Sequence, residues 1–233
     1  MGAWDSDDPA MKTGDLMLDA RQKRLRDANG RAYDLATHQW QVDEGTVSGR
    51  RLTVVEALRW VQRDSGHPRR EPVAVVGGRR ASVDDLTRAH ALGAGLAKIG
   101  LVVLCGGRGG VMRAVCEGVA SEGGVSVGLL PGDTIADAND AVTIPIATGL
   151  GIARKAVIAR AALCVVAVGG SYGTLSEMAL AMHCGRVVFA LRGAPAIDGV
   201  DVLGSVDAAL DALARYALGL DRRAKPAHSP GDA

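Results

Sequence analysis

Residues 168–177 read VGGSYGTLSE and follow the apolar run LCVVA at residues 163–167. The apolar positions after them have a helical spacing, so the pattern predicts a buried strand that turns through glycines into a helix. The first N–H groups of a helix lack partners within it and lie at the positive end of its dipole, which suits a bound phosphate. The stretch therefore predicts an α/β fold with a phosphate site. The candidate binding residues are Gly169, Gly170, Ser171, Tyr172, Gly173 and Thr174.

Glu177 has two interpretations that the sequence leaves open. Thr174 and Glu177 have the spacing of a capping box, in which the glutamate bonds the amide of the N-cap residue three positions earlier. A carboxylate here would repel a phosphate, so in the other interpretation it acts on a group attached to that phosphate. Glu177 is thus a candidate catalytic residue and a candidate helix cap.

Two further glycine turns follow predicted strands. The apolar residues 101–105 lead into GGRGG at residues 106–110, and residues 73–76 lead into a glycine pair. The carboxyl ends of parallel strands meet at one edge of a sheet, and ligands of open α/β sheets bind in the crevice outside that edge. The three turns together predict a ligand site there. These two turns add the candidates Gly77, Gly78, Gly106, Gly107 and Gly110.

The region from 71 to 220 alternates between short apolar runs and helical stretches, which predicts a Rossmann-like, mostly parallel sheet with helices on both faces. We expect strands near residues 72–77, 101–105, 125–130, 142–146, 163–168 and 187–191. We expect helices near residues 83–99, 110–122, 150–162, 173–184 and 205–218.

The chain outside this region has a different character. Residues 1–70 are polar and carry all three tryptophans, which predicts a small appendage that packs on the main domain or on a neighbouring subunit. Within it we expect a tight turn at residues 27–30 and a helix that opens at Thr53. Residues 221–233 are rich in charge and proline, and we expect a disordered tail.

Composition excludes several classes of function. The 233 residues are 48% hydrophobic with a net charge of +1, so neither nucleic acid nor an anionic membrane is an expected partner. The four cysteines show no C-x-x-C spacing, and the histidines show no metal-ligand spacing, which predicts reduced core thiols and no metal site. No apolar run has membrane-spanning length, and the start of the chain lacks the pattern of a signal peptide. We expect a cytoplasmic protein.

Three motifs together resemble the LONELY GUY superfamily, whose members are often labelled lysine decarboxylase-like. They are GGRGGVM at residues 106–112, the pair Arg154-Lys155, and GSYGTLSE at residues 170–177, and the resemblance covers roughly residues 72–192. Residues 130–132 and 145–154 are most similar to a bacterial branch related to the molybdenum cofactor carrier protein. Lys155 has no separate cofactor signature beside it, so a Schiff-base decarboxylase is not expected.

The resemblance implies a Rossmann-like homodimer, or a higher assembly, that binds a nucleoside 5′-monophosphate. In the catalytic members the bond between base and ribose 5-phosphate is hydrolysed without a cofactor, and the residues that match Arg154 and Glu177 are the catalytic pair. We add Thr148 and Gly149 to the candidate ligand-binding residues. We also expect apolar helix residues to be buried between subunits, namely Val157, Ile158, Ala161, Met178, Leu180 and Met182.

The chain departs from the hydrolases at three places. They carry proline where this chain has Gly169, and glutamates where it has Ala153 and Ser176. These differences weaken the expectation of hydrolysis more than that of phosphate binding. Two functions stay open: a nucleoside 5′-monophosphate phosphoribohydrolase, and a non-catalytic carrier that binds molybdenum cofactor as its ligand.

Overall fold

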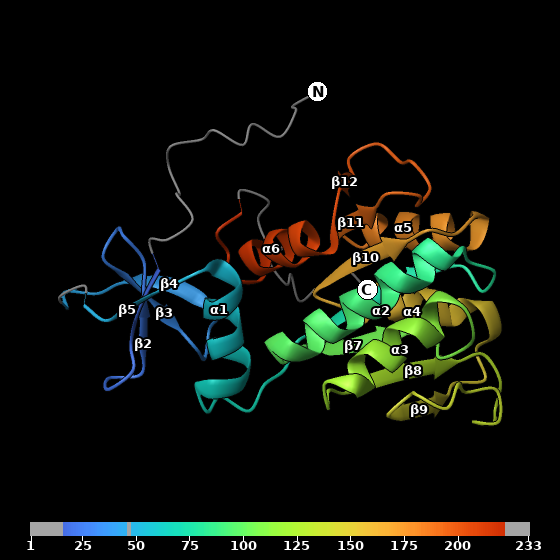
Figure 1. Cartoon of the computed structure of the whole chain (residues 1–233), viewed down its shortest axis with the longest axis horizontal. Coiled ribbons are helices and arrows are strands. Elements are labelled where there is room, and N and C mark those ends of the chain that lie inside the picture. Colours follow the sequence, from blue (N-terminus) through green and yellow to red (C-terminus); the bar gives the residue numbers. More distant parts are fainter. Residues whose placement is uncertain (1–15, 46–47, 222–233) are drawn as a thin grey trace.

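The protein contains two β-sheets (Figure 1), seen in a computed structural model that describes residues 16–45 and 48–221. The larger sheet has seven parallel strands in the order β12-β11-β10-β6-β7-β8-β9. Their bounds are β6 Pro72–Gly77, β7 Val102–Cys105, β8 Ser126–Leu130, β9 Ile144–Ala147, β10 Cys164–Val168, β11 Val187–Leu191 and β12 Asp201–Leu203. The parallel Rossmann-like sheet is confirmed. Strand β12 was not predicted, because three residues between turns carry too little pattern.

Helices cover both faces of this sheet. Their bounds are α2 Val83–Ile99, α3 Val111–Ser121, α4 Arg154–Ala161, α5 Tyr172–His183 and α6 Val206–Ala217. Strand β6 shows how the faces divide: Val73 and Val75 belong to the core packed under α2, α3 and α6, whereas Ala74 and Val76 belong to the core packed under α4 and α5. Alternate residues of a strand point to opposite faces, so both faces of β6 are buried.

The order of the strands reverses at β6. From β6 the chain proceeds through β7 and β8 to β9, and then crosses back to place β10 on the other side of β6. Such a reversal leaves a crevice at the carboxyl ends of the two strands that flank it. The turns after β6 and β10, which hold Gly78 and Gly170, lie at this crevice.

The predicted appendage contains a second, antiparallel sheet of order β4-β3-β2-β1-β5. Its strands are β1 Leu16–Asp19, β2 Arg24–Arg26, β3 Arg31–Asp34, β4 Gln39–Val42 and β5 Arg50–Leu52. The predicted turn at residues 27–30 joins β2 to β3. Thr53 caps α1 (Val54–Arg59) in a capping box with Glu56, and a π-helical segment, Trp60–Asp64, follows.

This sheet packs on its own chain, one of the two arrangements the sequence left open. The indole of Trp40 donates a hydrogen bond to the carbonyl of Leu218 at 2.6 Å. Leu25 and Leu58 share one apolar core with Tyr216 of α6. The expected disordered tail lies, apart from Asp221, outside the described residues.

The cysteines are free thiols, and Cys105, Cys116 and Cys164 are buried in the core as expected. Among residues 16–45 and 48–221, no helix combines the length and the apolar character needed to cross a membrane.

Candidate functional site

Three glycine turns meet at the carboxyl edge of the parallel sheet. A Cβ on Gly78 would lie 3.3 Å from the Cα of Gly170, and a Cβ on Gly110 would collide with the carbonyl oxygens of Gly78 and Arg79. The amide of Val111, the first residue of α3, donates to the carbonyl of Gly78 at 3.1 Å. Backbones this close leave no room for side chains, so the turns after β6, β7 and β10 form one continuous surface.

Helix α5 starts at this surface with unpaired amides. Gly169 and Gly170 both have positive φ, +53° and +103°, and they turn the chain from β10 into the helix. Ser171 is the N-cap residue but makes no side-chain capping bond. The first N–H of the helix with a backbone partner is that of Leu175, which donates to Ser171 at 2.9 Å. The N–H groups of residues 172–174 are therefore available to an anion.

The capping-box interpretation of Glu177 is wrong. Because the helix starts at Tyr172, Thr174 lies inside its first turn, and Glu177 lies in the second turn, out of reach of the N-cap amide. Within the described part of the chain, the Glu177 carboxyl makes no hydrogen bond or ion pair. Burial raises its pKa above that of an ordinary glutamate, and the positive charges of Lys155 and Arg154 oppose this shift.

Arg154 is held in place at the start of α4. Its Nε donates to the carbonyl of Leu129 at 2.7 Å and its Nη1 to the carbonyl of Gly151 at 2.9 Å. A Cβ on Gly106 would lie 3.4 Å from Nη2, so the guanidinium lies over the second glycine turn. Burial lowers the pKa of Arg154, with Glu177 acting against this and nearby arginines reinforcing it. Arg154 and Glu177 thus influence each other electrostatically.

Lys155 connects α4 to the start of α5. Its Nζ donates to the carbonyl of Gly173 at 2.8 Å and contacts the Ser176 hydroxyl at 3.0 Å. Its charge therefore lies beside the unpaired amides and next to Ser176. This placement agrees with a helix contact beside a phosphate site rather than with a Schiff-base lysine.

The loop between β8 and β9 fixes the second glycine turn. The side-chain amide of Asn139 donates to the carbonyls of Gly107 at 3.1 Å and Arg108 at 3.0 Å. The guanidinium of Arg108 pairs with Asp137 at 3.3 Å. The sequence contained no signal for the role of Asn139, because an asparagine in a loop is commonplace.

Four predicted site residues take part in packing or loop closure at this edge. Thr148 donates its hydroxyl to the carbonyl of Leu130 at 2.6 Å, and Gly149 donates its amide to Gly132 at 2.8 Å. Gly77 faces Val111 of α3, and Gly169 faces the carboxylate of Asp85.

Tyr172 and Thr174 differ in exposure although both belong to the first turn of α5. Tyr172 is 88% exposed, so it is not packed into a helix interface of its own chain. Thr174 is buried against Gly170, and its hydroxyl has no partner among the described residues. Leaving a buried hydroxyl without a hydrogen bond costs free energy. Such hydroxyls often lie at sites where a bound ligand supplies the missing partner.

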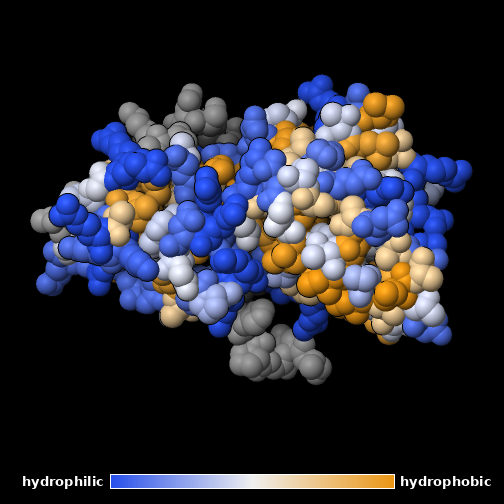
Figure 2. Space-filling model, turned by 60° about the horizontal axis from the view of Figure 1, so that its bottom comes forward, coloured by the Kyte–Doolittle hydropathy of each residue, from blue (hydrophilic) through white to orange (hydrophobic). Residues whose placement is uncertain are grey.

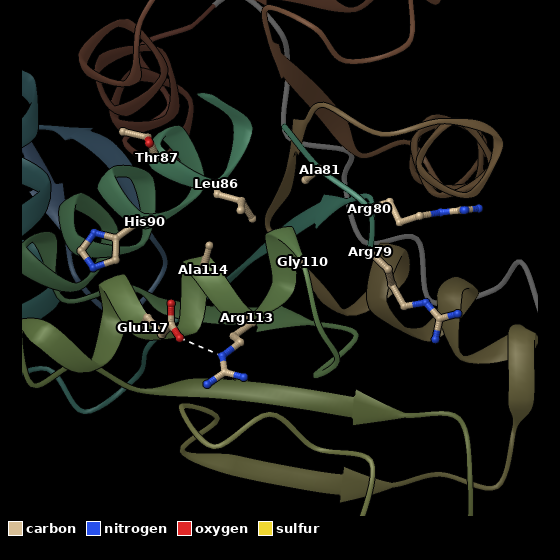
Figure 3. Close-up of a pocket in the computed structure, with 10 residues that line it drawn as sticks. All are labelled: Arg79, Arg80, Ala81, Leu86, Thr87, His90, Gly110, Arg113, Ala114 and Glu117. Carbon is tan, nitrogen blue, oxygen red and sulfur yellow. Dashed lines mark hydrogen bonds and ion pairs between the residues drawn. The ribbon is translucent and has the colours of Figure 1, made fainter. Parts of the chain in front are cut away.

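A groove of about 1030 Å³ lies beside the turns, between α2 and α3 (Figure 3). It is lined by Arg79, Arg80, Ala81, Leu86, Thr87, His90, Gly110, Arg113, Ala114 and Glu117. Only Gly110 among the predicted site residues lines it. The available amides and the Arg154–Glu177 pair lie at the sheet edge instead, so we place the candidate site there.

These features define the class of the protein: a Rossmann-like α/β protein with glycine turns at the reversal of its strand order. The chain belongs to the SLOG cluster4 family, whose model matches residues 70–212. A protein of Archaeoglobus fulgidus described as uncharacterized is 34% identical over 139 residues, which is 60% of this chain and 91% of that protein.

Two solved structures share the fold and a third of the aligned sequence. The molybdenum cofactor binding protein of Rippkaea orientalis has 32% identity and a TM-score of 0.59, covering 63% of this chain and 96% of its own. The molybdenum cofactor carrier protein of Chlamydomonas reinhardtii has 34% identity and a TM-score of 0.58, covering 64% of this chain and 98% of its own. The antiparallel sheet, at residues 16–52, precedes the part that the family model matches.

Proposed function

We propose that this protein binds a phosphate ester of nucleotide type at the crevice where the three glycine turns meet. The observation that carries the proposal is the start of α5, where the amides of residues 172–174 converge behind Gly170 and no side chain caps them. The phosphate lies against the amides from Gly170 to Thr174, and Lys155 adds positive charge beside it. Residues 71–220 form the ligand-binding unit in this proposal, and residues 1–70 are an appendage to it.

Arg154 and Glu177 favour a reaction at the organic part of the ligand. Breaking the bond between a base and ribose 5-phosphate develops positive charge on the sugar, which a carboxylate stabilises, and needs a water that a base can orient. Glu177 is half-buried, makes no hydrogen bond or ion pair within the described part of the chain, and interacts electrostatically with Arg154, which makes it the candidate for that carboxylate. The LONELY GUY resemblance supports the same pair, and this chemistry requires no cofactor.

The similarity to molybdenum cofactor proteins favours a second function, a non-catalytic carrier. Both solved relatives are covered almost fully by this chain. The replacement of two hydrolase glutamates by Ala153 and Ser176 points the same way. The molybdenum cofactor would then be cargo, and its phosphate would occupy the same amides.

Incubation of the purified protein with AMP and related monophosphates, followed by chromatography for free base, separates the two functions. Saturable AMP binding with release of base supports the hydrolase. Binding of molybdenum cofactor without base release supports the carrier. If neither ligand binds, the proposed phosphate site is refuted.

We also propose a homodimer. Two of the residues expected between subunits, Ile158 and Met178, are instead buried in the core of their own chain, so that part of the expectation is wrong. Apolar exposure remains at Ile152, which is 76% exposed, and at Leu150 and Val157. The part of the molecule that carries the parallel sheet shows gathered hydrophobic side chains in Figure 2. Such surface is typical of contacts between copies.

Light scattering at micromolar concentration is expected to report a dimer or a larger assembly. The double variant Ile152→Glu/Val157→Glu places charges in the exposed patch and should shift the mass toward the monomer. A parent protein that is monomeric at this concentration would contradict the proposed assembly.

A further inference from the structure

Arg79 and Arg80 follow Gly78, which lies at the crevice, and neither residue belongs to the phosphate site proposed above. Both side chains are exposed, and neither forms an ion pair or side-chain hydrogen bond with the described part of the chain. Both residues line the groove between α2 and α3, and in Figure 3 their side chains extend away from the other residues that line it.

The backbone that carries the two arginines is held between the other turns. The carbonyls of Gly78 and Arg79 abut Gly110, and Gly78 itself faces Gly170. Residue 79 is thereby positioned against the turn after β7, and residue 80 follows at the entrance to α2. The two guanidiniums start from a rigid base beside the proposed phosphate position.

The positive charge here exceeds what the neighbouring carboxylates neutralise. Asp137 pairs with Arg108, and Asp85 is bound by Ser82 and Arg88.

The positive charges of Arg79 and Arg108 both lower the pKa of Arg154, so the three arginines are close enough to interact electrostatically. Glu177 interacts electrostatically with Arg154 and Lys155, on another part of the site. A single phosphate on the α5 amides leaves the two arginines without an anion.

We propose that the ligand is a diphosphate ester whose second phosphoryl group is held by Arg79 and Arg80. Guanidinium groups bind phosphoryl oxygens through paired, charge-assisted hydrogen bonds, and two adjacent arginines suit an anion linked to the first phosphate. This inference rests on the proposed phosphate site and specifies its ligand class.

Calorimetric titration with AMP and ADP, without divalent cations and at fixed ionic strength, tests the proposal. ADP is expected to bind the parent at least about tenfold more tightly than AMP. The variant Arg79→Ala/Arg80→Ala should bind ADP as weakly as AMP and keep its AMP affinity within about threefold. Arg51→Ala/Arg59→Ala removes the same charge from exposed positions of the N-terminal part and should leave the difference intact.

Each other outcome has one meaning. Equal affinities of AMP and ADP in the parent overturn the inference and leave the phosphate site standing. An equal loss of both affinities in the Arg79/Arg80 variant overturns it as well, because the arginines would then hold the first phosphate. If the parent binds neither nucleotide, the proposed function itself fails.

Discussion

Any release of base from AMP is expected to fall at least about a hundredfold when Glu177 is replaced by glutamine, while the nucleotide still binds. The Glu177→Gln side chain keeps the shape but lacks the charge that would stabilise positive charge on the ribose, a loss of roughly 3–4 kcal/mol. Chromatography of free base measures the rate, and calorimetry measures AMP binding. Removing a negative charge near the phosphate leaves binding unchanged or slightly stronger.

The same variant changes how stability depends on pH. Burial raises the pKa of Glu177, so the folded protein holds this proton more tightly than the unfolded chain. The stability of the parent should therefore fall as pH rises from the ordinary glutamate pKa through the raised one. The glutamine variant lacks this loss and should be at least as stable at pH 7, with the difference shrinking toward acidic pH.

Glu122→Gln provides the control, since Glu122 ends α3 and pairs with Lys98 away from the site. It should keep the parent rate. If Glu177→Gln also releases base as fast as the parent, the chain has no catalytic carboxylate at this site and only binding remains.

Replacing Gly170 with alanine is expected to weaken AMP binding by about a hundredfold. Gly170 has a φ of +103°, and a Cβ there would collide with the side chain of Thr174. The turn must move to relieve the collision, and the amides behind it lose their alignment with the phosphate. Backbone strain of about 1–2 kcal/mol should also lower the melting temperature.

Gly123→Ala separates strain from the effect on the site. Gly123 has a φ of +63°, no atom lies within 4 Å of the added Cβ, and it belongs to the turn after α3. This variant should lose comparable stability and bind AMP within about twofold of the parent. A folded Gly170→Ala protein with parental affinity would exclude this turn as the phosphate site.

The sequence predicted most of the parallel sheet because the strands are largely apolar and three of them, β6, β7 and β10, lead into glycine turns. Strand β10 at Cys164–Val168 and helix α5 at Tyr172–His183 lie within one residue of the expected ranges 163–168 and 173–184. The sequence also predicted that the three glycine turns meet, because each of them follows a parallel strand and such strands end at the same edge of the sheet. The spacing could not decide at which residue α5 begins. A start after Thr174 would make Glu177 a capping residue, whereas the observed start at Tyr172 leaves its carboxyl free of that role.

The parts that sequence missed depend on contacts between distant segments. The antiparallel sheet has strands of three or four residues, too short for a reliable alternation of apolar and polar positions. The sequence did not single out Arg79, because its place beside the proposed phosphate site depends on the contact between Gly78 and Gly170. Ile158 and Met178 were expected in an interface because a helical stripe does not reveal whether a sheet or a second chain covers it.

A crystal structure of the protein with AMP tests the central claim most directly, because it locates the phosphate. We predict phosphate oxygens at hydrogen-bonding distance, about 2.7–3.2 Å, from the amide nitrogens between Gly170 and Thr174. A phosphate bound elsewhere, for example in the groove between α2 and α3, with those amides capped by the protein itself, would contradict it.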